Sequence, residues 1–287
     1  ATEKMAAELE EASGGRLKIE HYPASQLGAE REILEGVALG TIDCGIISSG
    51  VVAGFSNSVY VTNMPYLIDD REIGWKVYDG EFGQMLGKKT EEEGGWKFLG
   101  WCDNSLRMFS NTKREIQTPA DMVGLKIRTQ DSPTSIAMIR AMGGSATPMS
   151  SGETYTGLQQ GIIDGAENNE TVLVQDGHGE VCKSYTYTQH QMVPDIVIIS
   201  TETWESLDEA EQSAIVNGMT QGNEAHEAVW QDLVQENIDG AKEMGVQFYT
   251  IDKTAFIEAT QSLRDEFCAK SADNARYYED FLSYVQA

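Results

Sequence analysis

The sequence lacks the features that mark several large classes of protein. No apolar run approaches the roughly 20 residues that a membrane-spanning helix requires. Basic residues are scarce, because 21 lysines and arginines stand against 46 aspartates and glutamates in 287 residues, a net charge of −25. A surface this negative repels nucleic acids and anionic lipids, so we expect neither as a partner. The 40% of hydrophobic residues is enough for a packed core.

Cysteine is also rare. Cys44, Cys102, Cys182 and Cys268 lie far apart and form no CxxC pair, which argues against a zinc site or a thioredoxin-type redox motif. Four cysteines allow three fully paired disulfide connectivities, or none. The disulfide state and the redox compartment therefore stay open at this point.

The usual enzyme motifs are missing. The dinucleotide-binding GxGxxG, the hydrolase GxSxG and the metalloprotease HExxH are all absent. Residues 83–89 differ from a phosphate-binding loop in their glycine spacing, and no serine or threonine follows Lys88. We therefore expect no cofactor and no metal site.

The chain begins on a segment, residues 1–14, that is predicted to be a charged amphipathic helix and not a secretory signal. An opening helix is unusual for an α/β protein. We therefore expect that a leader peptide and a first strand are missing from the sequence.

Strands and helices are predicted to alternate along the chain, which favours α/β layering. The longest helical pattern runs to about Met244 and exceeds the length of ordinary globular helices, so it is expected to span the molecule. The predicted strands cover residues 16–22, 42–47, 96–101, 106–110, 125–128, 185–187, 196–200 and 246–250, and the main helices cover 30–39, 71–93 with glycine breaks, 152–160, 206–244 and 254 to the end.

Two arginines stand out by their context. Arg128 ends the predicted strand 125–128, and ligands of open α/β sheets bind beyond the carboxyl ends of strands. A guanidinium can hold a carboxylate by two parallel hydrogen bonds, which lysine cannot. The other arginine, Arg107, lies in the predicted strand 106–110. Spacing alone favours the alternative, in which each arginine pairs with a nearby acid. The polar residues 164–170 are equally compatible with a hydroxyl-binding segment and with a turn or helix cap.

An ordered set of short segments resembles one known family. The segments are residues 13–17, 26–30, 40–43, 64–67, 118–128, 142–149, 153–155, 158–161 and 164–168. In this order they resemble the periplasmic solute-binding proteins of TRAP transporters, the family typified by dicarboxylate- and sialic-acid-binding members. The resemblance covers nearly the whole chain, although no single segment is specific.

The resemblance implies an α/β, two-lobed periplasmic-binding-protein-like fold, with a ligand cleft between the lobes and a long spanning helix. We expect residues 1–104 plus 192–232 to form lobe I, and residues 105–191 plus 233–287 to form lobe II. It implies an extracytoplasmic receptor, periplasmic once its leader is removed, which delivers a small carboxylate to the TRAP membrane subunits. We expect a monomer that catalyses no reaction.

The resemblance also implies site residues. Arg128 would bind a carboxylate, with Arg107 as a second cation and Asn168 as a polar contact. Ser48 and Ser151 stand where the sialic-acid binders carry a glutamate and an aromatic residue, which argues against sialic acid. The doubled asparagine at 168–169 and the segment 190–195 are similar to relatives that bind hexuronates.

Hydroxyl groups of a sugar also need partners, because a pocket must satisfy the polar groups that it buries. The candidates are Asn168, Asn169, Asp195, Glu30 and Ser48. An acidic side chain at such a position repels a carboxylate but accepts from a hydroxyl, which favours a polyhydroxy acid over a plain dicarboxylate. The resemblance implies that this acid is a hexuronate such as glucuronate or galacturonate. One alternative is a C4-dicarboxylate or another organic acid. A more distant one is an α/β hydrolase or isomerase in which Asp164, Glu167 and His190 act as acid and base.

Overall fold

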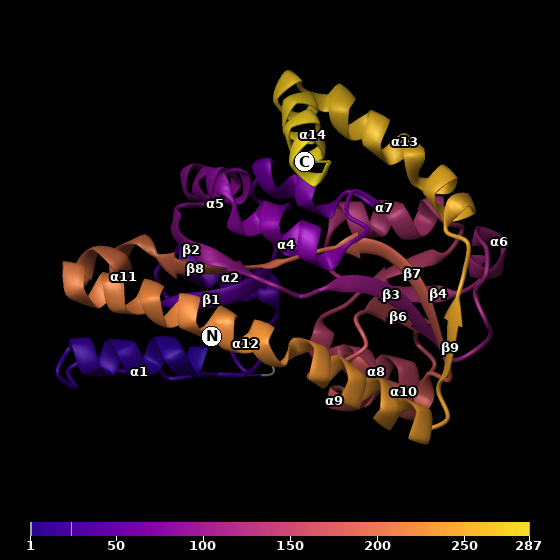
Figure 1. Ribbon diagram of the computed structural model, residues 1–287, viewed down its shortest axis with the longest axis horizontal. Helices are drawn as coiled ribbons and strands as arrows, with labels where there is room; N and C mark the ends of the chain where they lie inside the picture. Colours follow the sequence, from indigo (N-terminus) through magenta and orange to yellow (C-terminus); the bar gives the residue numbers. More distant parts are fainter. Residues whose placement is uncertain (1, 24, 287) are drawn as a thin grey trace.

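A computed structural model describes residues 2–23 and 25–286, and its strands form two separate sheets (Figure 1). The first sheet has the antiparallel order β1 (Cys44–Ser48), β8 (Asp195–Ser200), β2 (Trp96–Cys102). The second sheet has the order β5 (Ser145–Pro148), β4 (Lys126–Thr129), β6 (Gly165–Asn168), β3 (Leu106–Asn111), β7 (Ser184–Met192), β9 (Gln247–Thr250).

The direction of the strands brings one edge of each sheet to the boundary between them. In the second sheet β4 runs parallel to β6, and β3 runs antiparallel to β6 and β7. The last residues of β4, β6 and β7 therefore lie beside the first residues of β3. In the first sheet Asp195, which opens β8, pairs with Ser48 at the end of β1 and with Cys102 at the end of β2. The chain crosses between these edges at residues 103–105 and 193–194.

Helices cover both sheets (Figure 1). Segments up to the end of β2 contribute α1 (Thr2–Ala12), α2 (Glu30–Ala38), α3 (Ser49–Val52), the 3-10 helix η1 (Ser58–Asn63), α4 (Arg71–Asp79) and α5 (Glu81–Gly94). In the sequence, five helices lie between strands of the second sheet and one follows its last strand. They are α6 (Pro119–Met122), α7 (Pro133–Ala141), α8 (Ser151–Gln159), α9 (Val172–Gln175), α10 (His178–Val181) and, after β9, α13 (Thr254–Lys270). The short helix α11 (Thr201–Ser206) follows β8.

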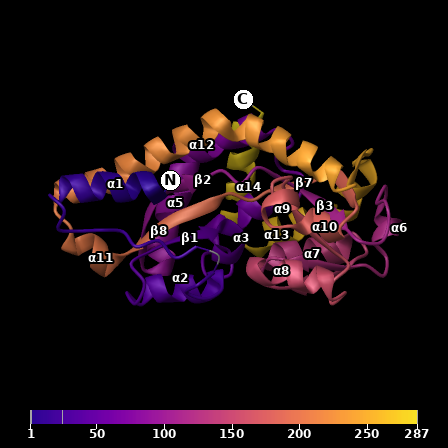
Figure 2. The same ribbon diagram turned by 90° about the horizontal axis from the view of Figure 1, so that it is seen from below.

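The predicted spanning helix is present as α12, Glu209–Glu243, with 35 residues. Asp208 caps its start, because its carboxylate accepts from the backbone N–H groups of Ala210 and Glu211. The helix contacts α1 and β2 on one side of the molecule and α9 on the other. Figure 2 shows it arching over both lobes.

Two expectations differ from the structure. Residues 16–22 form no strand, because they have no neighbouring strand to pair with; Leu17 and Ile19 instead pack on the apolar cluster that contains Met5 and Ile215. The C-terminal helical segment breaks at Ser271, and α14 (Ala272–Val285) packs against η1, α4 and α5. That packing groups α14 with residues 1–104, whereas the prediction placed all of 233–287 in lobe II. The exact lobe boundaries stay a prediction.

The four cysteines are free thiols in the structure. Within the described ranges, no helix combines the length and the apolar character needed to cross a membrane.

The contact between α1 and α12 generates a stability prediction. A methyl group at Gly218 would lie 2.6 Å from the Cα atom of Met5 and 2.8 Å from the carbonyl oxygen of Lys4. These are backbone atoms of a helix, which cannot move aside cheaply. Gly218→Ala should therefore destabilise the protein by about 1–3 kcal/mol, although alanine is the better helix former. Thermal unfolding of Gly218→Ala measures the loss of stability, with Thr220→Ala, an exposed position in the same helix, as the control. A stability of Gly218→Ala equal to or above that of the wild type would contradict the contact.

Candidate functional site

The predicted site residues gather at the two facing sheet edges. Arg107 lies near the start of β3, Arg128 near the end of β4, and Asn168 ends β6. On the other side, Ser48 ends β1, Asp195 opens β8 and Glu30 opens α2. Residues far apart in the sequence thus meet because the strand ends of both sheets meet.

Arg107 is fully buried and already has a carboxylate partner. Its Nε and Nη2 atoms donate to the two carboxylate oxygens of Glu167, and Nη2 also donates to the backbone oxygen of Glu167 at 2.8 Å. Its Nη1 atom donates to Asn168 Oδ1 at 3.2 Å. A guanidinium has five N–H donors, so these bonds leave Arg107 one N–H, on Nη1, for a ligand.

Glu167 is the neutralising partner of this pair. Burial alone would raise its pKa, but the charge of Arg107 and the bonds that Arg107 donates outweigh burial and lower the pKa to about 2. His190 Nε2 lies 3.7 Å from Glu167 Oε2, which is beyond hydrogen-bond distance. Burial lowers the pKa of His190, and its ring stacks on Phe109 with centroids 4.4 Å apart. Glu167 therefore stays ionised and His190 neutral at pH 7.

The environment of Arg128 differs from that of Arg107. Its side chain is buried, at 4% exposure, and its Nε atom donates to the Met149 backbone oxygen at 2.9 Å. Within the described residues, no carboxylate lies within 4.0 Å of this guanidinium, and its two terminal nitrogens have no acceptor. Burial and the neighbouring charge of Arg107 lower the pKa of Arg128, while Glu167 and Glu30 oppose them. A buried charge without a partner is costly, so the fold leaves the terminal nitrogens of Arg128 as unused donors.

The first lobe presents carboxyl groups to the same site. Glu30 Oε1 accepts from the backbone N–H of Ser48 at 3.0 Å. Burial raises the pKa of Glu30, and the charges of Arg128 and Arg107 oppose it. Burial, followed by the charge of Glu30, raises the pKa of Asp195 to about 7, against the charge of Arg107. The site is therefore cationic on its second-lobe side and acidic on its first-lobe side.

The remaining predicted residues differ in which of their hydrogen-bonding atoms are unpaired. Asn168 Oδ1 is occupied by Arg107, but its Nδ2 has no acceptor among the described residues. Asn169 uses its whole amide within the protein, because Nδ2 donates to Asn104 and Oδ1 accepts from Thr171. Ser48 Oγ accepts from the N–H of Gly50 at 3.2 Å and so caps α3. Direct contact between Asn169 and a ligand stays a prediction, although both polar atoms of its amide already have partners within the protein.

Several polar residues at these edges escaped the sequence reasoning. Glu167 was considered only as an acid or base, not as the partner of Arg107, and Asn104 was not considered. Ser49 Oγ, Asn63 Oδ1 and Gln130 Oε1 are buried and have no hydrogen-bond partner in the described structure. The sequence could have indicated Gln130, since this residue follows Arg128 just past the end of β4. Nothing in the sequence indicated that Ser49 or Asn63 would lie at the site.

Acid–base chemistry finds little support in this arrangement. Asp164 lies at the other end of β6 from Asn168, where it accepts from the backbone N–H of Lys126 at 2.9 Å. Glu167 is held by Arg107. The three residues that the hydrolase or isomerase alternative requires therefore do not converge on one point. No group of three or more histidine, cysteine, aspartate or glutamate side chains suited to a metal is found in residues 2–23 and 25–286.

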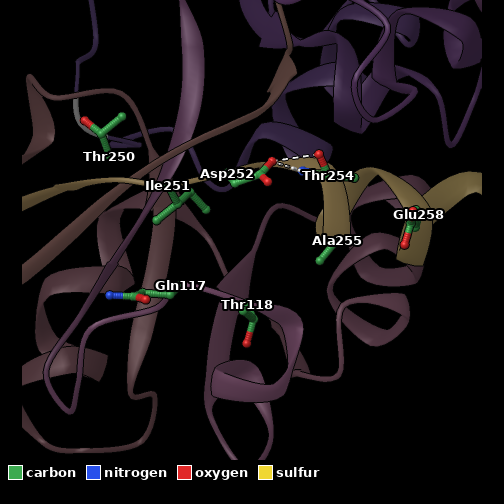
Figure 3. Close-up of a pocket in the computed structure, with 8 residues that line it drawn as sticks. All are labelled: Gln117, Thr118, Thr250, Ile251, Asp252, Thr254, Ala255 and Glu258. Carbon is green, nitrogen blue, oxygen red and sulfur yellow. Dashed lines mark hydrogen bonds between the residues drawn. The ribbon is translucent and has the colours of Figure 1, made fainter.

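Two surface hollows lie away from this site. One, of about 510 Å³, is formed by the segment before α6, by the end of β9 and by α13, and Figure 3 shows Asp252 in it, bonded to Thr254. The other, of about 310 Å³, lies between α4 and α12 and includes Arg71 and Trp230. Neither is lined by a predicted ligand residue. Arg31 Nη1 of α2 lies 3.3 Å from Asp131 Oδ2, which follows β4, so an exposed ion pair joins the two sides of the molecule.

Comparison with known proteins gives a consistent picture. A model of the family described as bacterial extracellular solute-binding protein, family 7 (DctP), matches residues 1–271. The chain is similar to the 2,3-diketo-L-gulonate-binding periplasmic protein of Escherichia coli, with 35% identity over 270 residues that cover 93% of this chain and 82% of that protein.

Solved structures of TRAP periplasmic solute-binding proteins are similar over almost the whole chain. One from Anaerococcus prevotii, with bound D-glucuronate, is 36% identical with a TM-score of 0.94 and covers 99% of this chain and 92% of its own. One from Xanthobacter autotrophicus, with bound β-D-galacturonate, is 30% identical with a TM-score of 0.93 and covers 98% and 94%. These similarities confirm the predicted two-lobed α/β fold with its long helix.

The Arg107–Glu167 pair generates a prediction on stability and pH. The folded pKa of Glu167, about 2, is below its ordinary value of 4.5. Its ionised form therefore stabilises the fold above pH 4.5, and this contribution is lost as the pH falls from 4.5 toward 2. Glu167→Gln should unfold more easily at pH 7, by about 3–5 kcal/mol because Arg107 is left unpaired, and should show a flatter loss of stability in that acidic window.

Urea unfolding at a series of pH values measures both effects. Glu224→Gln is the control, since Glu224 is exposed on α12. If the stability of Glu167→Gln falls between pH 4.5 and 2 as steeply as that of the wild type, Glu167 is not the group responsible for the pH dependence.

Proposed function

We propose that this chain, which belongs to the bacterial extracellular solute-binding protein family 7, is the receptor of a TRAP transporter and binds a hexuronate such as glucuronate or galacturonate. The observation that carries the proposal is the buried guanidinium of Arg128, which has no anionic partner in the described structure. The relatives solved with bound D-glucuronate and β-D-galacturonate support this choice of ligand.

Each end of a hexuronate matches one side of the site. The carboxylate binds the free terminal nitrogens of Arg128, and the last N–H of Arg107 and the Nδ2 atom of Asn168 lie at the same sheet edge. Charge-assisted bonds of this kind are strong in a site that excludes water. The sugar hydroxyls donate to Glu30 and Asp195 on the other lobe.

The acidic side of the site argues against the main alternative. A C4-dicarboxylate would place its second carboxylate near Glu30 and Asp195, where like charges repel. A hexuronate has only one carboxylate, and its hydroxyls are donors. The organic-acid alternative within the same family is therefore the weaker one.

We also propose that the protein returns its ligand unchanged, because Asp164, Glu167 and His190 do not converge. The setting that fits is the periplasm, with delivery to the TRAP membrane subunits. We propose a monomer without a nucleic-acid partner, in keeping with its net charge of −25.

The first prediction concerns the carboxylate. Arg128→Ala should weaken glucuronate binding by about 30- to several-thousand-fold, the equivalent of about 2–5 kcal/mol for a lost partner of a buried charge pair. Arg128→Lys should recover little, because lysine lacks the two-pronged geometry. Titration calorimetry checks both, with Arg140→Ala, an exposed arginine of α7, as control. Affinity close to that of the wild type in either variant would remove Arg128 from the central role.

The second prediction concerns the hydroxyls. Glucuronate or galacturonate should raise the unfolding temperature strongly, and succinate or malate should raise it little. Asp195→Ala should weaken uronate binding about 10- to 150-fold, as expected for a lost hydrogen bond to a charged group, with no comparable loss for succinate. A large shift with the dicarboxylates alone would overturn the choice of ligand, and an altered sugar after incubation, seen by NMR, would indicate an enzyme.

A further inference from the structure

One side chain in a segment that crosses between the lobes contacts residues on both sides of the site. Asn104 lies in the crossing 103–105, and its Oδ1 accepts from Asn169 Nδ2 at 3.0 Å. Its Nδ2 donates to Asp195 Oδ1 at 3.5 Å. Asn169 follows β6 in the second sheet, and Asp195 opens β8 in the first. Asn104 therefore contacts a residue beside Asn168 and a carboxylate of the opposite lobe at once.

The orientation of this amide follows from its neighbours. The backbone N–H of Thr171 is a donor and lies 3.0 Å from Asn169 Oδ1, so that atom of Asn169 must be the oxygen. Asn169 Nδ2 then needs acceptors, which are Asn104 Oδ1 and the Asn104 backbone oxygen at 3.1 Å. The Nδ2 of Asn104 is thereby turned toward Asp195, where a donor is needed.

Asp195 is surrounded mostly by groups that disfavour its ionised form. Glu30 from α2 and Asp103 from the crossing are like charges, and burial acts in the same direction. The thiol of Cys102 on β2 is also nearby. Arg107 from β3 and the Asn104 amide are the two groups that favour the carboxylate. Of these two, the charge of Arg107 contributes more, and Asn104 is the one whose amide donates a hydrogen bond to the carboxylate.

We propose that Asn104 is a positioning residue of the ligand site, which orients Asp195 and keeps it an acceptor for sugar hydroxyls. Asn104 acts through Asp195 and does not itself touch the ligand. Selectivity for hydroxylated acids then depends on a residue of the interlobe crossing as well as on the residues that line the site. This inference rests on the proposed function for its ligand, but not for the effect of Asn104 on Asp195.

The test compares Asn104→Ala with the wild type at pH values on both sides of 7, the region where Asp195 titrates. Affinity for glucuronate should rise with pH as Asp195 ionises, and Asn104→Ala should move this rise to higher pH. Binding near pH 7 should weaken about 2- to 10-fold, as expected for one lost hydrogen bond, and recover at alkaline pH. Asn104→Asp, which keeps the acceptor for Asn169 but adds a negative charge, should move the rise further.

A double-mutant cycle separates positioning from general damage. In an Asp195→Asn background the pH dependence should vanish and Asn104→Ala should have little further effect. Asn217→Ala, an exposed asparagine of α12, is the control. A loss of affinity that is equal at all pH values, or that persists in the Asp195→Asn background, would overturn the proposal.

A second readout needs no ligand. The titration of the Asp195 carboxyl can be followed by NMR with carbon-13-labelled aspartate, the signal being assigned by its absence in Asp195→Asn. Asn104→Ala should raise the midpoint, and it should still fold because Asn169 keeps the Asn104 backbone oxygen as an acceptor. An unchanged midpoint would overturn the role of Asn104 even if uronates bind. A wild-type protein that binds no uronate would instead overturn the proposed function alone.

Discussion

Two buried guanidinium groups lie at one sheet edge, and among the described residues only Arg107 has an acidic partner. Glu167 accepts three hydrogen bonds from Nε and Nη2 of Arg107, two on its carboxylate and one on its backbone oxygen, which uses most of the donors of that arginine. Arg128 is left with its outer nitrogens unpaired inside the protein. Isolated ions are unstable in such surroundings, so the second arginine depends on an anion that the chain does not supply. The arrangement of the site follows from this asymmetry.

The two lobes divide the chemistry of recognition between them. The six-stranded sheet contributes cations and an amide donor at the ends of β4, β6 and the start of β3. The three-stranded sheet contributes carboxyl groups, at Asp195 and, through α2, at Glu30. The ligand that we propose, with one acidic end and one hydroxylated end, would bridge the two lobes, so that a single molecule could satisfy both edges. The crossing residue Asn104 joins these two halves of the site.

Much of the fold was predictable because the signals are local. Glycine breaks and short apolar runs located many of the elements to within a few residues, whereas β5 and β6 were not predicted as strands. The differences at residues 16–22 and after Thr254 have the same cause. The apolar pattern of a segment indicates its local conformation, but not which other segments it will pack against. Whether an extended segment finds a strand to pair with, and onto which lobe α14 packs, depends on residues distant in sequence.

The sequence by itself determined that Arg128 lies at the end of a strand, because strand length and turn residues are encoded within a few positions. Only the tertiary structure decided which arginine would be neutralised. Arg107 and Glu167 are 60 residues apart, and they meet because β3 and β6 are neighbours in the sheet. Charge pairing inside a protein depends on such distances in space and on the exclusion of water, neither of which is written in the spacing of residues along the chain.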